Sequence, residues 1–597
     1  MLRGPQNDVE KINNLKNKQK TRNKLPLVII DKEEQIKQPK SIANKLNEYF
    51  VHKGPKLASR LPPSNKSIFK NMIPRVSDSI INIILDTPEV RKCMIDIKTN
   101  KALAYDNIPP KIIKWLADVL APLITQIFNR YLSLGKYPDL FKIAKITALH
   151  KDGDRSDCEN YRPISVLPQL NQIFEKLIQC HLTDFFTKNN VLTKNQYGFR
   201  KGHSTSHGIT HLNEKVIESL EKKYICAVLF IDLKSAFDTI DHDILIKKLE
   251  HYGVRGNTLS LLKSYLQNRK QYVCGGDGID SILLDVTIGV PQGSVLGPLL
   301  FIIFINDIVN CNNLSAVLFA DDAAFLGYHK SLKHLKKIMN TQTKQICDWL
   351  ITNKLTINVK KTKYMIFHKK KGGKFRKMVK KFKIYVNNFC IKQVEEFKYL
   401  GITIDNKLNW HNHIEYLCSH VSKAAGVLYR LKPKLPSSAL KLIYHSLISS
   451  KLRYGIAAWG SARSTALHRL NLLNNKAVKN LKRPTEDLLS TYNRLKFFTI
   501  KSLYEVETAK FIHLFKESKL PDEFNNFVES INHNHYTRST MQHNYKLPQP
   551  RTDLGKSSIK FQGVKVWNDL PIYIKEEKNT NKFKDKHKTY LLQQQSI

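Results

Sequence analysis

The chain has 597 residues, of which 97 are Lys or Arg and 51 are Asp or Glu, so its formal net charge is +46. An apolar content of 42% with 9% aromatic residues excludes wholesale disorder, and the length suits about four domains of ordinary size. A positive surplus of this size favours a polyanionic partner, either nucleic acid or an anionic membrane.

The first 75 residues are polar and basic, and we expect a basic linker or N-terminal extension with one short helix at Ser41–Val51. They lack the apolar core of a secretory signal. From about Ile80 the pattern turns globular, with apolar residues at helical spacing in several stretches and strand-like alternation in one. The helical stretches are Val90–Ile97, Ile112–Leu134 and Ser165–Phe186, and the strand is Ile143–Leu149.

The middle third carries the densest signals. Ile225–Leu233 is a nearly continuous apolar run, typical of a strand buried on both faces. Further elements are a helix over Asp243–His251, a helix over Thr258–Gln267 capped by Asn257, a strand over Asp285–Val290, a helix from Gly297 through Phe304 and a β-hairpin over Ser315–Leu326. After about Glu396 the pattern is mainly helical, and past Asp522 it loosens into sequence rich in His, Asn and Pro.

Three other classes of protein are not indicated. The longest apolar run, Val295–Ile305, is about half the roughly 20 residues that a membrane-spanning helix needs. The 9 cysteines are scattered without a C-x-x-C pair, so neither a zinc site nor a disulfide framework is expected. Elimination leaves an intracellular protein that binds nucleic acid and has no membrane partner.

Carboxylates at the ends of these predicted strands suggest a metal site. Asp232 ends the buried strand, and Asp321 and Asp322 lie at the tip of the hairpin. Carboxylates in such places are costly to desolvate unless a cation compensates, and Mg²⁺ accepts one or two carboxylates together with substrate phosphates. Adjacent strand residues point to opposite faces, so we expect Asp232 and Asp321 as the main ligands and Asp322 as an accessory one. The alternative is an ordinary hairpin whose turn happens to be Asp-Asp.

Several longer motifs favour the metal site, because they occur in the order and spacing of reverse transcriptase motifs. In the predicted palm they are FIDLKSAFD (Phe230–Asp238), GVPQGSVLGPLLF (Gly289–Phe301) and LFADDAAFL (Leu318–Leu326). The series is completed by NYRPISVLP (Asn160–Pro168), QYGFRKGHST (Gln196–Thr205), KLTINVKKT (Lys354–Thr362) and FKYLGITID (Phe397–Asp405). Between about residues 75 and 575 the chain resembles the reverse transcriptase of a non-LTR retrotransposon of the jockey type.

The resemblance implies an α+β right-hand polymerase fold, with fingers, a palm built on an antiparallel sheet and a helical thumb. The regions that it implies are an N-terminal extension at 1–75, fingers at 76–225, palm with part of the fingers at 226–395, primer-grip turn and thumb at 396–490, and a C-terminal extension at 491–597. An endonuclease usually precedes the polymerase in this class. None is recognisable before residue 75, so we expect that a separate endonuclease supplies the nick.

The resemblance also assigns roles to single residues. Asp232, Asp321 and Asp322 correspond to the metal-binding aspartates, and Lys361 to a palm lysine suited to protonating pyrophosphate. For the incoming nucleotide, the resemblance implies the following contacts: Phe237 as a steric gate that excludes a 2′-OH, Gln292 and Gly293 beside the nucleotide, and Lys151 and Arg162 on the triphosphate. On spacing alone, ordinary helix core would be the favoured reading of Phe237. The alternatives for Lys151 and Arg162 are a surface lysine and a structural arginine.

Nucleic-acid contacts are predicted at two places. Lys369–Lys383 is strongly basic and would lie beside the palm, so Lys369, Lys370, Lys371 and Arg376 are expected to contact phosphates. A solvated loop and a nuclear localisation patch are the alternatives. Tyr399 and Gly401 lie in a turn that resembles the one supporting the primer end.

The predicted function is therefore RNA-directed DNA polymerisation with two Mg²⁺ ions, or Mn²⁺ in their place, using an RNA template, a DNA primer and dNTPs. A second hypothesis is a catalytically inactive retroelement product that still binds RNA or DNA. A third, RNA-templated RNA synthesis, conflicts with Phe237, because a small residue would be needed there to admit the 2′-OH. The family's life cycle implies a cytoplasmic ribonucleoprotein and the nucleus as locations.

Overall fold

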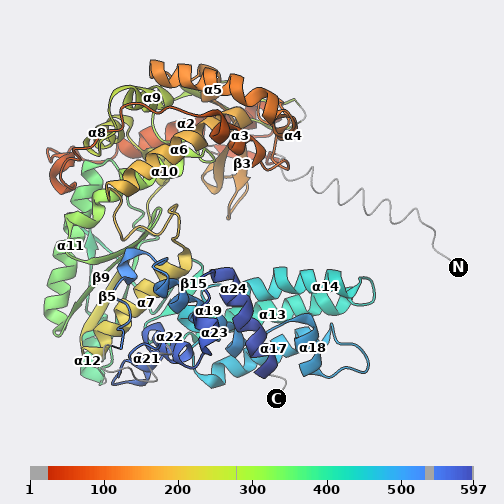
Figure 1. Ribbon diagram of the computed structural model, residues 1–597. Helices are drawn as coiled ribbons and strands as arrows, with labels where there is room; N and C mark the ends of the chain where they lie inside the picture. Colours follow the sequence, from red (N-terminus) through yellow and green to blue (C-terminus); the bar gives the residue numbers. More distant parts are fainter. Residues whose placement is uncertain (1–24, 32, 277, 371, 532–542, 595–597) are drawn as a thin grey trace. The chain divides into compact units, whose positions relative to one another are not determined.

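The structure is a computed structural model that describes residues 25–31, 33–276, 278–370, 372–531 and 543–594. The chain folds into two compact units, each assembled from separated segments (Figure 1). Unit 1 comprises Met1–Thr193, Leu233–Cys311 and Ile346–Ile357, and unit 2 comprises Lys194–Asp232, Asn312–Gln345 and Asn358–Ile597. The chain therefore passes from unit 2 to unit 1 directly after Asp232 and returns later.

Unit 1 contains a mixed sheet in the order β4-β3-β6-β7. Its strands are β3 (Ile143–His150), β4 (Tyr161–Val166), β6 (Arg269–Val273) and β7 (Leu284–Val286). Strand β3 is antiparallel to β4 and parallel to β6. The strand expected at Asp285–Val290 is thus shorter and ends at Val286.

From Ile29 onward the N-terminal region has more regular secondary structure than expected. The predicted helix Ser41–Val51 is part of a longer helix, α2 (Pro39–Ala58), and two short strands precede it, β1 (Ile29–Asp31) and β2 (Glu34–Ile36). Ile42, Leu46 and Phe50 are buried in one cluster with residues of β3 and β6. These residues recur on one helical face, so the segment from Ile29 onward is part of the core of unit 1 rather than a linker.

The other helices of unit 1 follow the expected order with shifted ends. They are α3 (Thr87–Ile95), α4 (Pro110–Trp115), α5 (Ala117–Leu134), α6 (Gln169–Lys188), α8 (His242–His251), α9 (Gly256–Leu266) and α10 (Leu296–Phe304). Helix α6 begins after Pro168, because Ser165 belongs to β4. Asn257 is not the N-cap of α9: the cap is Arg255, and the Asn257 amide donates to the Ser133 carbonyl at 2.9 Å.

Unit 2 is built on a sheet in the order β13-β10-β5-β9-β8. Its strands are β5 (Ile225–Ile231), β8 (Ser315–Phe319), β9 (Asp322–His329), β10 (Lys363–Phe367) and β13 (Lys392–Gln393). Strand β5 lies between β9 and β10, antiparallel to both, and all of its residues are buried. This confirms the strand expected from the apolar run at Ile225–Leu233 and the hairpin expected at Ser315–Leu326.

Helices of unit 2 share one apolar core with this sheet. They include α7 (Thr205–Glu221), α13 (His411–Leu431), α14 (Ser437–Tyr444), α17 (Ser464–Lys479), α18 (Leu488–Leu495) and α19 (Ile500–Lys516). Two smaller elements are the hairpin of β14 (Glu396–Tyr399) with β15 (Ile402–Asp405), and the basic helix α12 (Gly373–Lys380). Helix α11 (Leu332–Thr352) runs from unit 2 into unit 1.

The sequence suggested a loosening past Asp522, but residues 543–594 are largely helical. They form α21 (Asp553–Lys556), α22 (Ile559–Asn568), α23 (Ile572–Lys575) and α24 (Thr580–Gln594). Helices α22 and α24 pack on α19 (Figure 1), and Trp567 and Phe583 are fully buried there. Among the described residues, no helix combines the length and the apolar character needed to cross a membrane.

Candidate nucleotidyl-transfer site

Asp232 lies beside the Asp321-Asp322 turn because of the register between β5 and β9. Ile231 is paired with Ala323, so the residue after β5 lies next to the first residue of β9. Strands β8 and β9 are joined by Ala320 and Asp321 alone, with Phe319 opposite Asp322. The structure therefore brings together the three carboxylates that the sequence singled out.

The electrostatics of Asp322 reflect this crowding. Removal of its carboxylate from water raises its pKa to about 6, and repulsion by the charges of Asp321 and Asp232 acts in the same direction. The residue as a whole is exposed, and its carboxylate is close enough to the other two aspartates to be affected by their charges. A divalent cation would stabilise the ionised Asp322 carboxylate beside these two neighbours.

Asp232 is held in place by the segment before β10. The Asn358 side-chain amide donates to the Asp232 carboxylate at 2.8 Å, and the Asn358 backbone N–H donates to the Asp232 carbonyl at 2.8 Å. The Asp232 N–H donates in turn to the Thr362 hydroxyl at 3.3 Å. Lys361 is exposed beside these contacts, and its N–H donates to the Asn358 carbonyl at 3.1 Å. Lys361, the predicted proton donor, and Asp232 are thus both hydrogen-bonded to Asn358.

The carboxylates suit a metal ion that the substrate helps to bind. Within the described part of the chain, no three His, Cys, Asp or Glu side chains form a group that could hold a metal ion by themselves. Mg²⁺ is commonly bound by one or two carboxylates, with water and substrate phosphates completing the octahedron. Asp232, Asp321 and Asp322 fit that mode of binding.

The residues predicted around the nucleotide base and sugar lie in unit 1. The Gln292 amide donates to the Asp238 carboxylate at 2.6 Å, and the Gln292 carbonyl accepts from the Ser165 N–H at 2.7 Å. Burial raises the pKa of Asp238, with Gln292 and Lys53 acting in the opposite direction. Asp238 is a partner of Gln292 that sequence reasoning missed, although it ends the FIDLKSAFD motif.

The backbone conformation at position 293 requires glycine. Its φ is 121°, a conformation that residues with a side chain rarely adopt, and an added Cβ would lie 2.5 Å from the Ser165 carbonyl oxygen. The close approach seen here is therefore to β4, whereas the sequence suggested an approach to the nucleotide. Phe237 is half-buried, and its ring stacks on Phe301 with centroids 4.7 Å apart.

Lys151 and Arg162 lie on one hairpin of unit 1. Arg162 is in β4 opposite Leu149 of β3, and Lys151 directly follows β3. Both residues are exposed, and the Lys151 N–H donates to the Asn160 carbonyl at 2.8 Å. The hairpin thus presents one cation on β4 and another directly after β3, and both are exposed.

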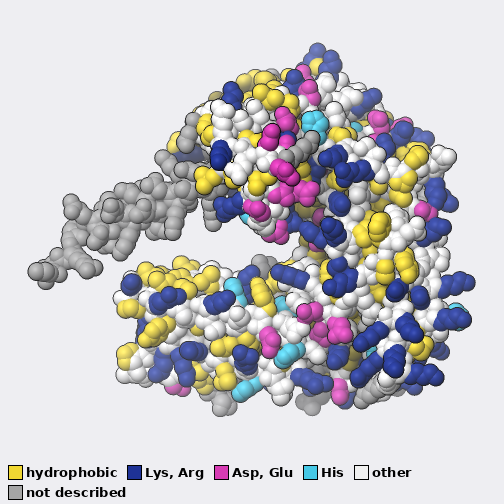
Figure 2. All heavy atoms as spheres, turned by 180° about the vertical axis from the view of Figure 1, so that it is seen from behind, with side chains coloured by type: hydrophobic (Ala, Val, Ile, Leu, Met, Phe, Trp, Pro, Cys, Tyr) yellow, Lys and Arg dark blue, Asp and Glu magenta, His cyan; other side chains and the backbone are white. Residues whose placement is uncertain are grey.

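The predicted phosphate-binding lysines are in different environments. The Lys369 ammonium donates to Glu221 at 3.1 Å, and the Lys370 ammonium donates to the Lys330 carbonyl at 3.3 Å. Arg376 is exposed on α12, while Lys371 lies outside the described residues. Figure 2 shows Lys and Arg side chains spread widely over the face in view, so the positive surplus is not confined to one patch.

Tyr399 and Gly401 form a rigid turn. The Tyr399 ring is buried, and its hydroxyl donates to the Val317 carbonyl of β8 at 3.1 Å. Leu400 and Gly401 have φ angles of 46° and 84°, and the Tyr454 hydroxyl donates to the Leu400 carbonyl at 2.6 Å. Because the Tyr399 side chain is buried, a primer could contact this turn through its backbone but not through that side chain.

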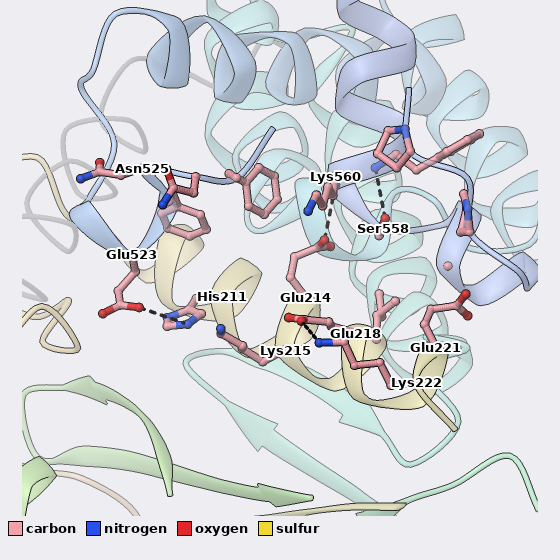
Figure 3. Close-up of a pocket in the computed structure, with 18 of the residues that line it drawn as sticks. His211, Glu214, Lys215, Glu218, Glu221, Lys222, Glu523, Asn525, Ser558 and Lys560 are labelled. Atoms are coloured by element: carbon pink, nitrogen blue, oxygen red, sulfur yellow. Dashed lines mark hydrogen bonds and ion pairs between the residues drawn. The ribbon is translucent and has the colours of Figure 1, made fainter. Parts of the chain in front are cut away.

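A separate pocket of about 770 Å³ in unit 2 is lined by α7 and by C-terminal segments (Figure 3). None of the predicted site residues lines it. Glu214 of α7 accepts from the Ile559 N–H of α22 at 2.8 Å, and the His211 ring lies 4.0 Å from the Glu523 carboxylate. These contacts join α7 to the C-terminal helices.

Comparison with known proteins identifies the class. Residues 149–404 match the family described as "Reverse transcriptase (RNA-dependent DNA polymerase)", a segment that runs from just before Lys151 to just beyond Gly401. The chain therefore contains a reverse transcriptase domain, which confirms the predicted right-hand polymerase fold class. Domains of this family act with a divalent metal ion.

More particularly, the chain is similar in sequence to RNA-directed DNA polymerases of mobile elements. It is 29% identical over 410 residues to the "Probable RNA-directed DNA polymerase from transposon BS" of Drosophila melanogaster, covering 66% of this chain and 44% of that protein. It is 29% identical over 405 residues to the "RNA-directed DNA polymerase from mobile element jockey" of the same organism, covering 66% of this chain and 43% of that protein. The matched region spans less than half the length of these curated relatives.

A solved telomerase structure from Candida albicans also matches, at 13% identity and a TM-score of 0.31, covering 63% of this chain and 66% of that one. A similarity this weak adds nothing to the assignment of the fold.

Proposed function

We propose that the protein is the RNA-directed DNA polymerase of a non-LTR retrotransposon, and that it copies element RNA into DNA. The observation that carries the proposal is the placement of Asp232 beside the Asp321-Asp322 turn, inside the segment that matches the reverse transcriptase family. The reaction is the attack of a primer 3′-OH on the α-phosphate of a dNTP, with pyrophosphate as the leaving group.

Asp232 and Asp321 would be the main ligands of two Mg²⁺ ions, or of Mn²⁺, with Asp322 accessory. When bound, such ions supply positive charge for activating the primer hydroxyl and stabilising the pyrophosphate. Asn358 keeps the Asp232 carboxylate oriented through its 2.8 Å hydrogen bond. Lys361, exposed on the same segment, would protonate the departing pyrophosphate.

Substrate selection would rest on unit 1. Phe237 would exclude the 2′-OH of a ribonucleotide by a steric clash, and its stacking on Phe301 supports a fixed ring position. Gln292, oriented by Asp238, would contact the nucleotide. Lys151 and Arg162 would bind the triphosphate from their shared hairpin.

The partners would be an RNA template and a DNA primer. The net charge of +46 and exposed cations such as Arg376 support phosphate contacts that do not depend on sequence and weaken steeply with salt. Lys369 is less suited to this role than predicted, because it already pairs with Glu221. Two further points stay predictions. One is that a separate endonuclease supplies the nick, and the other is that the protein resides in a cytoplasmic ribonucleoprotein and in the nucleus.

The test is template-directed synthesis by the purified chain. A DNA primer annealed to a heteropolymeric RNA is incubated with Mg²⁺ and each dNTP alone, and extension is expected only with the dNTP complementary to the next template base. Extension with rNTPs in preference to dNTPs would contradict the proposal. The proposal would also be contradicted if wild type bound the template–primer tightly but added no nucleotide. That result would favour an inactive protein that only binds nucleic acid.

A further inference from the structure

The turn that carries the catalytic aspartates has an unfavourable backbone. Ala320, the first of the two residues linking β8 to β9, has a φ of 53°. In two-residue hairpin turns a positive φ at this position is usually met by Gly, Asn or Asp, because other residues with a Cβ are strained there. Such a conformation persists only where the surrounding structure enforces it.

Gln196 provides that enforcement from a distant part of the sequence. Its side-chain carbonyl oxygen accepts a hydrogen bond from the Ala320 N–H at 3.0 Å and a second from the Gly198 N–H at 2.8 Å. Both partners are donors, so the orientation of the amide is set by its surroundings. Gln196 is 1% exposed, which keeps water from competing for the Ala320 N–H.

The segment around Gln196 also fits closely against the turn. The Tyr197 N–H donates to the Leu318 carbonyl at 2.8 Å, and the Leu318 N–H donates to the Asn195 carbonyl at 2.9 Å, so this segment extends the edge of β8. A Cβ on Gly198 would lie 2.5 Å from the Ala320 nitrogen, which requires glycine there. The QYG part of the QYGFRKGHST motif therefore packs directly on the turn.

We propose that Gln196 is a positioning residue for catalysis, which fixes the Ala320 backbone so that Asp321 and Asp322 are presented together to the metal ions. This inference rests on the proposed function. Gln196 itself does not touch the reacting atoms. Its role is to hold the turn in one conformation, because carboxylates that drift apart would share the metal ions less well.

The chemistry of the side chain supports this role over simple core packing. The Gln196 Nε2 is buried with no hydrogen-bond partner in the part of the chain that the structure describes. An unsatisfied donor is unfavourable, and an apolar residue of similar size would avoid it. The acceptor oxygen, with its bond to Ala320, is what an apolar residue could not supply.

The test compares Gln196→Met, which keeps the volume but removes the acceptor, with Gln196→Glu, which keeps an acceptor oxygen. The matched control is Asn195→Leu, because the Asn195 amide donates to the Ala316 carbonyl of β8 at 3.0 Å, away from the turn. Hydrogen exchange of the Ala320 amide is followed in peptides that cover the turn, without metal or substrate. Primer extension is measured over a range of Mg²⁺ concentrations.

We expect faster exchange at the turn in Gln196→Met, with protection kept in Gln196→Glu and in Asn195→Leu. In Gln196→Met, kcat should fall about tenfold to a hundredfold and the Mg²⁺ midpoint should rise, while the KM for dNTP changes little. The inference is overturned if Gln196→Met retains turn protection, or if its kcat falls no more than that of Asn195→Leu. If wild type shows no extension, the proposed function fails, and the exchange result still decides whether Gln196 holds the turn.

Discussion

Replacing Asp322 by Asn should stabilise the protein at neutral pH when no divalent ion is present. Asp322 has an ordinary pKa of 3.8 that is raised to about 6 by its removal from water and by Asp321 and Asp232. A shift of this size corresponds to about 3 kcal/mol if the site were fully shielded. The residue is exposed, so solvent screening reduces the expected gain to about 1 kcal/mol.

The sign of the pH dependence follows from the raised pKa. Below pH 3.8 the carboxyl group is protonated in the folded and unfolded states, so the substitution changes little. As pH rises towards 6, the unfolded state ionises more readily than the folded one, and wild type loses stability relative to Asp322→Asn. Above that pH the difference stays constant. Thermal unfolding from pH 4 to 8 in a metal chelator measures it.

Mg²⁺ should reduce the stability advantage of Asp322→Asn. At about ten times its Kd, a bound ion stabilises the folded state by about 1.4 kcal/mol, and wild type should gain more than Asp322→Asn. The reasoning would be refuted if the difference between the two proteins were the same at pH 4 and pH 8. Equal stabilisation of both by Mg²⁺ would equally refute the metal-site reading of these carboxylates.

Other predictions concern the gate, the nucleotide contact and the C-terminal packing. Phe237→Ala should admit rNTPs, and unchanged sugar selectivity in competition assays would contradict the gate. Asp238→Asn should raise the KM for dNTP about tenfold, because Gln292 loses its charged acceptor; in a Gln292→Ala background it should have no further effect. Burial raises the pKa of Glu214 from 4.5 to about 7, so wild type should lose stability relative to Glu214→Gln as pH rises through that window. A pH-independent difference in thermal unfolding would contradict this last prediction.

The sequence predicts those parts of the site in which a local apolar pattern ends at residues with suitable chemistry. The continuous apolar run ending at Asp232 indicates a buried strand, and the paired aspartates between two apolar arms indicate a hairpin. Both were confirmed. The motifs further suggested where the nucleotide contacts lie, because such motifs keep their order and spacing along the chain.

The contacts that hold the site and the helices in place could not be predicted from the sequence, because they join residues far apart in the chain. Gln196 lies 124 positions before Ala320, and nothing in its neighbourhood indicates the strained turn that it holds. The same limit applies to Glu214, which accepts from Ile559, 345 positions later. The C-terminal region was expected to be loose because its sequence is rich in His, Asn and Pro, yet Trp567 is fully buried. Its burial depends on α19, which a local pattern cannot reveal.

The most direct test of the account is primer extension by wild type and Asp321→Ala on one RNA template, with template–primer affinity measured for both at the same salt concentration. The account predicts dNTP incorporation by wild type, its loss in the variant and unchanged template–primer binding, since Asp321 is proposed to bind metal and not nucleic acid. Extension by Asp321→Ala at the wild-type rate would contradict the assignment of the catalytic carboxylates.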